Sequence, residues 1–417
     1  MTPTVELAFT ADMTDSVIQL KCNCNNYPWG KTGKDSLAAR LAANIPGTDF
    51  KLDGNKDYAE MWMGTYPELP SYVSKTGENL QDVLNANKEK LIGKKVLDKF
   101  GADLPFLPKI LSIAKALPLQ IHPNKELSAK LHQEKPDQFT DPNHKPEIAV
   151  ALSKFEAFCG FKPKADLQML LALAPLQQFD PEKGRWSDNT TREVCRAMLK
   201  ASEQTVRSTL KALGDTPEGK LGEQAYILDL IPRLIDQYGA SDNGNLVALV
   251  LMNYFVFSPG EAIWIPADGI HAYLAGDIVE CMARSNNVLN TGFCPAPDRD
   301  NVDLFCRALS FKQHDREKPL LHRSTTEKSN TGKTTAFRPP MSEFDMLVTE
   351  LKAGETDEIK AVNGPSIAFV TSGKGKMKAD GKEYDLAGGS IFYIGCGVDV
   401  AYESSSDDLA IYRAYAE

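Results

Sequence analysis

The chain has 417 residues, of which 42% are hydrophobic and 25% are charged. It contains 47 Lys and Arg against 56 Asp and Glu, so the formal net charge is −9. This composition is typical of a soluble globular protein of about two or three domains. The acidic balance argues against a general nucleic-acid binder, but it allows a basic pocket for a small anionic substrate.

Targeting and redox signals are weak in this sequence. No apolar run approaches the roughly 18 residues that a membrane span needs. Residues 1–15 include three acidic residues and lack the basic and apolar regions of a signal peptide. We therefore expect a cytoplasmic protein without a membrane partner. The eight cysteines are scattered, which predicts reduced, mostly buried thiols rather than a disulfide scaffold.

The spacing of apolar residues in the first half of the chain changes from a strand-like to a helix-like pattern. Residues 17–162 contain short apolar runs broken by Gly, Pro, Asn and Asp, a pattern typical of strands and turns, with one helix predicted at 124–133. From 163 to 245 the apolar residues recur with a period near 3.6, which predicts an all-helical insertion. Residues 246–255 are predicted to continue as a helix into a strand-rich segment.

The second half is predicted to be rich in strands. Residues 317–340, rich in Lys, Thr, Ser and Pro, are predicted to form an exposed, irregular linker, and 341–417 a series of short strands. Residues 260–266 resemble 389–395, since each segment opens with a Gly turn and continues into a strand. Many short strands with such a repeat indicate two cupin-type jelly rolls, so the predicted fold is mainly β with an α-helical insertion.

Three domains are expected. The first is a catalytic jelly roll built from 1–162 and 246–325, and the second is the helical insertion at 163–245. The third is a C-terminal cupin-like domain at 326–417 that lacks the histidine of the first copy and therefore lacks metal ligands.

Three short segments carry the strongest chemical signal. Each places two polar residues at positions i and i+2, which lie on the same face of a strand. The pairs are Gln120 and His122, Lys145 and Glu147, and His271 and Tyr273.

Two imidazoles, one carboxylate and one carboxamide oxygen can surround a divalent metal such as zinc. Each motif alone also fits a simpler interpretation, namely a polar pair near a barrel mouth, a solvated turn or a loop cap. The remaining histidines lie in polar or helical surroundings and are predicted to be surface or structural residues: His132, His144, His314 and His322. From the residue chemistry alone, the three motifs are compatible both with a metal site and with a purely structural role.

The sequence resembles the type I phosphomannose isomerases over about residues 20–310. Five segments carry the resemblance in order: YPWGKTGKDSLAARL, YAEMWMGTYPELPS, LPFLPKILSIAKALPLQIHPNKELSAKLH, DPNHKPEIAVALSKFEAFCGF and GEAIWIPADGIHAYLAGDIVECMARSNNVL. The resemblance implies a monomeric zinc enzyme that interconverts D-mannose 6-phosphate and D-fructose 6-phosphate and supplies GDP-mannose and glycan synthesis.

The resemblance also implies roles for individual residues. One zinc ion per chain would be held by Gln120, His122, Glu147 and His271. The pocket would include Lys109, Lys145, Tyr273 and Glu280. Glu280 is a candidate for the base that moves a proton between C1 and C2 through a cis-enediol, and the two lysines would stabilise the developing negative charge.

The sequence departs from the family pattern at two positions. Asn290 stands where the family commonly has an arginine regarded as catalytic, and Pro118 stands where a serine is expected. Asn cannot supply a positive charge or a guanidinium fork. Another cation would then serve the pocket, with Arg284, Arg299 and Lys312 as candidates. Arg284 would share a strand face with Asn290 if the strand is continuous, because their spacing is even.

Three alternatives follow from these observations. Asn290 is compatible with a catalytically weak or silent paralogue, or with a non-catalytic sensor that binds the sugar phosphate. A non-haem iron cupin oxygenase also uses two His and one carboxylate, but its usual His-x-His spacing is absent from this sequence.

Overall fold

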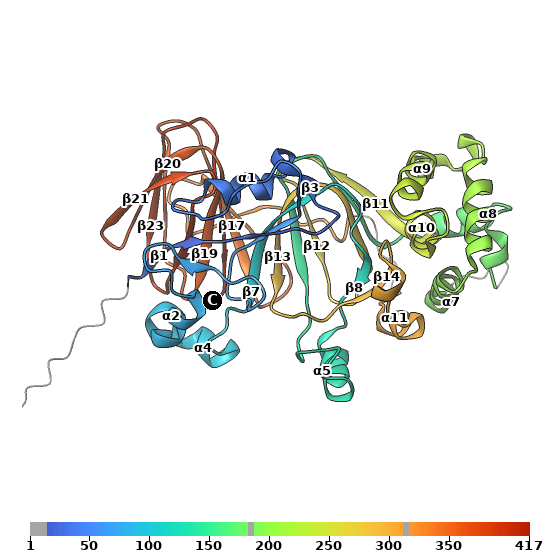
Figure 1. Cartoon of the computed structure of the whole chain (residues 1–417), viewed down its shortest axis with the longest axis horizontal. Coiled ribbons are helices and arrows are strands. Elements are labelled where there is room, and N and C mark those ends of the chain that lie inside the picture. Colours follow the sequence, from blue (N-terminus) through green and yellow to red (C-terminus); the bar gives the residue numbers. More distant parts are fainter. Residues whose placement is uncertain (1–14, 182–186, 312–316) are drawn as a thin grey trace, which may run out of the picture.

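The computed structural model describes residues 15–181, 187–311 and 317–417. Figure 1 shows three regions side by side along the long axis: a β-rich region at one end, a β-barrel in the middle and a group of helices at the other end. The predicted fold class, mainly β with an α-helical region, is confirmed. No helix among the described residues is long and apolar enough to cross a membrane.

The central barrel is built from one highly curved sheet. Its strands, in chain order, are β2 (Cys24–Asn25), β5 (Glu60–Trp62), β7 (Phe106–Ile113), β8 (Leu119–Ile121), β9 (Glu147–Ala151), β10 (Phe155–Phe161), β11 (Met252–Phe257), β12 (Ala262–Ile265), β13 (His271–Ala283) and β14 (Leu289–Gly292). A small ribbon of β3 (Lys31–Thr32) and β4 (Asp57–Tyr58) lies beside it. The helices α1 (Leu37–Asn44), α2 (Leu80–Ala86), α3 (Lys88–Leu91), α4 (Lys94–Phe100) and α5 (Lys125–Glu134) come from the same part of the chain. The position of α5 agrees with the helix predicted at 124–133.

The longest strand, β13, changes neighbours near its middle. Its first residues pair with β10 and, at His271, with β8, whereas the residues from Gly276 onward pair with β7 and those from Ile278 onward with β9. Gly276 has φ of +129°, and a Cβ there would lie 2.7 Å from the carbonyl oxygen of Lys154. Only glycine tolerates this close approach, so Gly276 lets β13 contribute to both walls of the barrel.

The helical region confirms the predicted change of period. It contains α6 (Lys164–Leu171), α7 (Asp188–Leu199), α8 (Glu203–Gly214), α9 (Tyr226–Tyr238) and α10 (Asn243–Leu246), followed by a π-helix (Val247–Leu251). Val206, Leu210 and Leu213 of α8 are buried at helical spacing, and the Ser202 side chain caps this helix by accepting from the Thr205 N–H. The helix α11 (Val302–Ala308) packs against α7.

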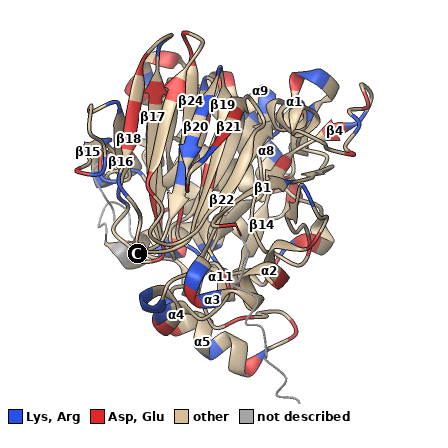
Figure 2. Ribbon diagram, turned by 90° about the vertical axis from the view of Figure 1, so that its left-hand side faces the viewer, with Lys and Arg blue, Asp and Glu red and all other residues tan. Residues whose placement is uncertain are grey.

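The C-terminal region consists of two packed sheets. The larger sheet runs β15 (Ser324–Thr325), β16 (Thr334–Phe337), β17 (Asp345–Leu351), β24 (Leu409–Tyr415), β19 (Ser366–Ser372), β22 (Ile391–Ile394), β1 (Val17–Lys21) and β6 (Tyr72–Val73). The smaller sheet runs β18 (Thr356–Ile359), β23 (Val400–Ser404), β20 (Lys374–Ala379) and β21 (Lys382–Ala387). Figure 2 shows Lys, Arg, Asp and Glu along the ribbons of β20 and β21. On the outer face of this sheet Lys376 of β20 is paired to Glu383 of β21, whereas Met377 faces the core.

Two sequence predictions were wrong in detail. The helix predicted at 246–255 ends at Leu251, because the residues from Met252 onward pair with β10 as strand β11. The linker predicted at 317–340 contains the partly buried strand β16, since the β-branched and aromatic residues of Thr334–Phe337 pair with β17.

The predicted domain limits stay a prediction, but the strand pairing bears on them. The first described strand, β1, pairs with β22 in the larger C-terminal sheet, although it precedes the central barrel in sequence. Residues 17–21 therefore lie in the sheet of the C-terminal region, whereas the next strand in the chain, β2, lies in the barrel sheet.

Candidate metal centre and active site

The interior of the central barrel is apolar over most of its length and polar toward one end. Ala149 of β9 and Leu111 of β7 belong to the buried apolar cluster inside the barrel. Glu147 and Lys109 precede them by two residues on the same strands, so their side chains lie on the same inward face. Strand alternation thus carries charged groups into a closed interior.

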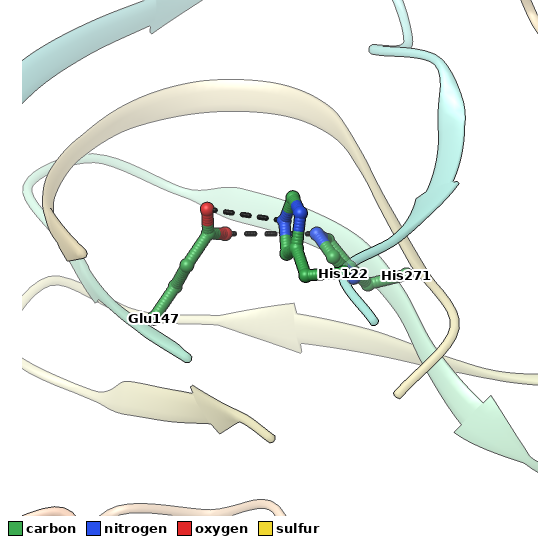
Figure 3. A group of neighbouring side chains, drawn as sticks. All are labelled: His122, Glu147 and His271. Atoms are coloured by element: carbon green, nitrogen blue, oxygen red, sulfur yellow. Dashed lines mark ion pairs between the residues drawn. The ribbon is translucent and has the colours of Figure 1, made fainter. Parts of the chain in front are cut away.

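Three side chains from separate segments meet at this polar end, since His122 directly follows β8, while Glu147 and His271 begin β9 and β13. The Nε2 atom of His122 lies 3.3 Å from Oε1 of Glu147, and Nε2 of His271 lies 3.6 Å from Oε2 of the same carboxylate (Figure 3). One ligand atom from each of the three lies within 4.8 Å of the others. His122 and His271 are fully buried, and Glu147 is 3% exposed.

The outer nitrogens of the two imidazoles fix their tautomers. Nδ1 of His122 lies 2.8 Å from the carbonyl oxygen of Asn287, and Nδ1 of His271 lies 3.0 Å from that of Gly269. A carbonyl oxygen only accepts hydrogen bonds, so either ring, when neutral, carries its proton on Nδ1 and directs the Nε2 lone pair toward Glu147. Neither Nε2 atom has a hydrogen-bond partner among the described residues.

This arrangement fits a bound cation. Burial and the charge of Lys145 lower the pKa of His122 to about 4, so its ring is neutral near pH 7. Burial alone would raise the pKa of Glu147, but the charge of Lys145 holds it well below its usual range. The Nε2 lone pair of His122 therefore faces a carboxylate with no proton between them. Ligand atoms about 2.1 Å from a tetrahedral zinc ion are themselves about 3.4 Å apart, which matches the two observed separations.

The fourth predicted ligand lies on the same face. Gln120 of β8 pairs directly with His271 on one side and with Asn290 on the other. Directly paired residues project to the same side of a sheet, so all three side chains share one face. The Oδ1 atom of Asn290 is buried without a hydrogen-bond partner among the described residues, while its backbone N–H donates to Asp300.

An ion pair lies beside the metal-ligating group. Lys109 and Glu280 occupy paired positions on β7 and β13, and the Lys109 ammonium lies 3.0 Å from Glu280 Oε1 and 3.5 Å from Glu60 Oε2. It also lies 4.8 Å from the centre of the Trp62 ring. Burial raises the pKa of Glu280 to about 7 despite the opposing charge of Lys109. Glu280 is therefore a buried carboxyl that can gain and lose a proton near neutral pH.

Lys145 and Tyr273 complete the polar end of the barrel. The Lys145 ammonium lies 3.3 Å from Glu147 Oε1. Tyr273 is fully buried, its ring lies 5.8 Å from that of His271, and its hydroxyl has no hydrogen-bond partner among the described residues. Burial and the charge of Glu147 raise the pKa of this phenol well above its usual value.

Arg284 lies in a pocket of about 500 Å³ outside the closed barrel interior. Its guanidinium donates to Thr65 Oγ1 at 3.1 Å and stacks 4.7 Å above the Tyr66 ring. Strand β13 connects the pocket to the metal-ligating group. Arg284 directly follows this strand, and Met282 near its end pairs with Glu147. Other basic groups on its wall are Lys99, Lys125 and His144.

The other cations proposed to replace the family arginine are placed differently. Arg299 is bound to the buried Asp242 at 2.7 Å and to the carbonyl oxygen of Cys294, so it serves the packing of the adjacent loop. Lys312 lies outside the described residues. The expectation that Arg284 and Asn290 share one strand face was wrong, because β13 ends at Ala283 and β14 begins only at Leu289.

Sequence reasoning missed two contributors to these sites. Glu60 joins the Lys109 ion pair, and its position on β5 beside Leu111 gives it the same inward face. Glu343, from the C-terminal region, lines the pocket of Arg284 and lies 2.8 Å from Nε2 of His144. No sequence pattern signals this contact, since the two residues are 199 positions apart.

Two family models match parts of this chain. A family model described as the catalytic domain of type I phosphomannose isomerase matches residues 17–164, and one described as the type I C-terminal region matches residues 337–382.

Full-length relatives are similar over nearly the whole chain. A mannose-6-phosphate isomerase of Schizosaccharomyces pombe is 35% identical, covering 96% of this chain and 99% of its own length. The corresponding protein of Saccharomyces cerevisiae is 33% identical, covering 97% and 100%. A solved structure of zinc-bound mannose 6-phosphate isomerase superposes with a TM-score of 0.80 at 25% identity, covering 97% of this chain and 100% of the other.

Proposed function

Because this chain belongs to the type I phosphomannose isomerase family, we propose that it interconverts D-mannose 6-phosphate and D-fructose 6-phosphate with one bound zinc ion. The observation that carries this proposal is the group of His122, Glu147 and His271, in which two imidazole lone pairs face one carboxylate. The product would feed the synthesis of GDP-mannose and of glycans.

We assign zinc binding to His122, Glu147 and His271, with Gln120 as the fourth ligand from the same face. The backbone carbonyls of Asn287 and Gly269 hold the two rings in the ligating tautomer, which is the usual outer support of a metal-bound histidine. When bound, the zinc ion supplies a Lewis acid that polarises the sugar carbonyl.

Glu280 is the proposed proton carrier. The reaction removes a proton from one of the carbons C1 and C2 and returns it to the other, by way of a cis-enediol. A carboxyl whose pKa is raised to about 7 by burial can accept and release that proton near neutral pH. Lys109, 3.0 Å from Glu280, keeps the carboxylate in place and adds positive potential where negative charge develops on the sugar oxygens.

Arg284 is the proposed anchor for the substrate phosphate. It is the guanidinium of the 500 Å³ pocket next to the barrel, and Lys99 and Lys125 add positive charge to the same wall. Arginine binds phosphate through paired, charge-assisted hydrogen bonds. In this proposal Arg284 performs the electrostatic role for which the family uses an arginine at the position of Asn290.

A silent sugar-phosphate-binding protein is the second candidate, and Asn290 is the observation that favours it. Asn290 brings no charge to the face it shares with Gln120 and His271. Such a protein would bind mannose 6-phosphate without converting it.

A coupled assay for fructose 6-phosphate, combined with metal analysis of the purified full chain, separates the two candidates. The isomerase proposal expects about one zinc per chain, loss of turnover on chelation and recovery on adding zinc back. Binding of mannose 6-phosphate by calorimetry without turnover by the zinc-loaded protein would establish the silent alternative. Iron with oxygen uptake would instead point to an oxygenase.

A further inference from the structure

The core of the C-terminal region contains a buried arginine. Arg413 lies on β24, where Leu409, Ile411 and Tyr415 point into the apolar core between the two sheets. Arg413 lies two residues from both Ile411 and Tyr415, so its side chain is on the same face of the strand and enters the same core. Its exposed fraction is only 2%.

The guanidinium makes few hydrogen bonds there. Its Nε donates to Ser366 Oγ at 2.9 Å, and that hydroxyl donates in turn to the carbonyl oxygen of Ile394. Neither Nη1 nor Nη2 has a hydrogen-bond partner among the described residues. Glu417 is the carboxylate whose charge reaches Arg413, but its Oε1 already accepts from Lys328 at 2.7 Å.

A second unsatisfied donor comes from the opposite sheet. Tyr402 of β23 is 2% exposed, and its hydroxyl also lacks a hydrogen-bond partner among the described residues. Tyr402 and Arg413 are close enough for each to shift the pKa of the other. Each of the two sheets therefore places a hydrogen-bond donor without a partner among the described residues in the core of the jelly roll.

Leaving this charge uncompensated would be costly. Arginine does not lose its proton in proteins, so burial cannot neutralise it as it neutralises a lysine or a carboxyl. A buried charge needs a counter-charge or hydrogen-bond acceptors. The surrounding side chains Leu347 and Ala368, which pair with Arg413 on either side, offer neither.

We propose that Arg413 and Tyr402 bind a small monovalent anion, chloride or one of similar size, inside the C-terminal jelly roll. Guanidinium and phenol N–H and O–H groups match an anion, which accepts hydrogen bonds and donates none. The side chains around the site are almost fully buried, so a monatomic anion fits this chemistry and a sugar phosphate does not. The anion links the two sheets and stabilises this region.

The test compares thermal unfolding of the full chain in sodium chloride and in sodium gluconate at equal ionic strength. A ligand that binds only the folded state raises the unfolding midpoint with its concentration, here by roughly 2 °C for each tenfold increase in chloride above its dissociation constant. Arg413→Met should abolish this dependence and Tyr402→Phe should weaken it. Arg338→Met, an exposed arginine of the same region, should leave it unchanged.

Crystals of the wild-type chain grown in bromide give an independent measurement that does not depend on the folding of a variant. An anomalous peak beside the guanidinium supports the proposal. Equal midpoints in chloride and gluconate, or ordered water without an anomalous signal at that position, would overturn it. Zinc content and isomerase turnover are measured separately, so this proposal and the proposed function can fail independently.

Discussion

The two jelly rolls of this chain use similar strands to enclose different interiors. Strand β12 of the central barrel and strand β22 of the C-terminal region are both four residues long and begin two residues after a glycine, as the repeat between 260–266 and 389–395 predicts. Ile265 of β12 faces the central barrel and pairs with Glu147, whereas Ile394 of β22 faces the C-terminal core and pairs with Ser366.

The difference between them lies in the charged side chains that enter each core. Among the described residues, the charged groups that the central barrel buries beside the proposed metal site include Lys109, Glu147, Glu280 and Glu60, which compensate one another or are arranged to take up a cation. The C-terminal core buries one cation, Arg413, without a carboxylate bound to it. The same architecture can therefore support catalysis or mainly provide stability, depending on a few inward positions.

The two regions also meet at the proposed substrate pocket. Glu343, which precedes β17, binds His144, and His144 directly precedes Lys145, whose ammonium lies 3.3 Å from Glu147. The C-terminal region thereby contributes part of the wall of a pocket whose chemistry lies in the central barrel.

Removing a histidine from the central barrel should have the largest effect. His271→Ala leaves Glu147 facing a single imidazole, and we expect loss of bound zinc and a fall in kcat/KM of roughly 10³-fold or more, since a catalytic metal supplies several kcal/mol. Metal analysis and the coupled assay measure both quantities. The exposed His322→Ala is the matched control and should retain both. Full zinc content and full turnover in His271→Ala would refute the ligand assignment.

Glu280→Gln should separate proton transfer from metal binding. We expect kcat to fall by about 10²–10⁴-fold, the usual contribution of a general base, while zinc content stays at the wild-type level. In the wild type, Glu280 takes up a proton as the pH falls through about 7, so kcat/KM should decrease toward acid pH. The amide of the variant cannot titrate, so the decrease of kcat/KM toward acid pH should be absent in Glu280→Gln. If the pH profile of Glu280→Gln is unchanged, another group causes the decrease of kcat/KM at acid pH.

Arg284→Ala tests the origin of the positive charge in the pocket. Losing charge-assisted hydrogen bonds worth about 1.5–3 kcal/mol should lower kcat/KM by roughly 10–100-fold, mainly through a higher KM for the sugar phosphate. If the pocket needs only one guanidinium, adding Asn290→Arg to this variant should restore part of the loss. Wild-type kinetics in Arg284→Ala would remove Arg284 from the proposed phosphate site.

The smallest effects compare equivalent positions in the two cores. Ile265→Val and Ile394→Val each delete one buried methylene, and each should lower the free energy of unfolding by about 0.5–1.5 kcal/mol. Only Ile265→Val should also weaken zinc binding by a few-fold, because Ile265 pairs with Glu147. Chemical denaturation and zinc titration measure the two properties. An equal change in zinc affinity in Ile394→Val would mean that the two cores are more strongly coupled than their contacts indicate.

Local sequence patterns predicted much of this molecule because they depend on backbone geometry. Alternation in His271 and Tyr273 follows from the two-residue repeat of a strand, whereas His122 lies just beyond the end of β8; the helical region follows from a period near 3.6. The motifs shared with type I phosphomannose isomerases indicated the family before any tertiary contact was known, and the full-length relatives show it.

Tertiary structure alone decided how these segments meet. Ligand atoms of His122, Glu147 and His271 come within 4.8 Å of one another because β13 bends at Gly276 and serves both walls of the barrel. The pairing of β1 with β22 and the meeting of His144 with Glu343 likewise depend on packing between distant segments. Periodicity fixes which face a side chain takes, but the free energy of burying whole surfaces determines which faces come together.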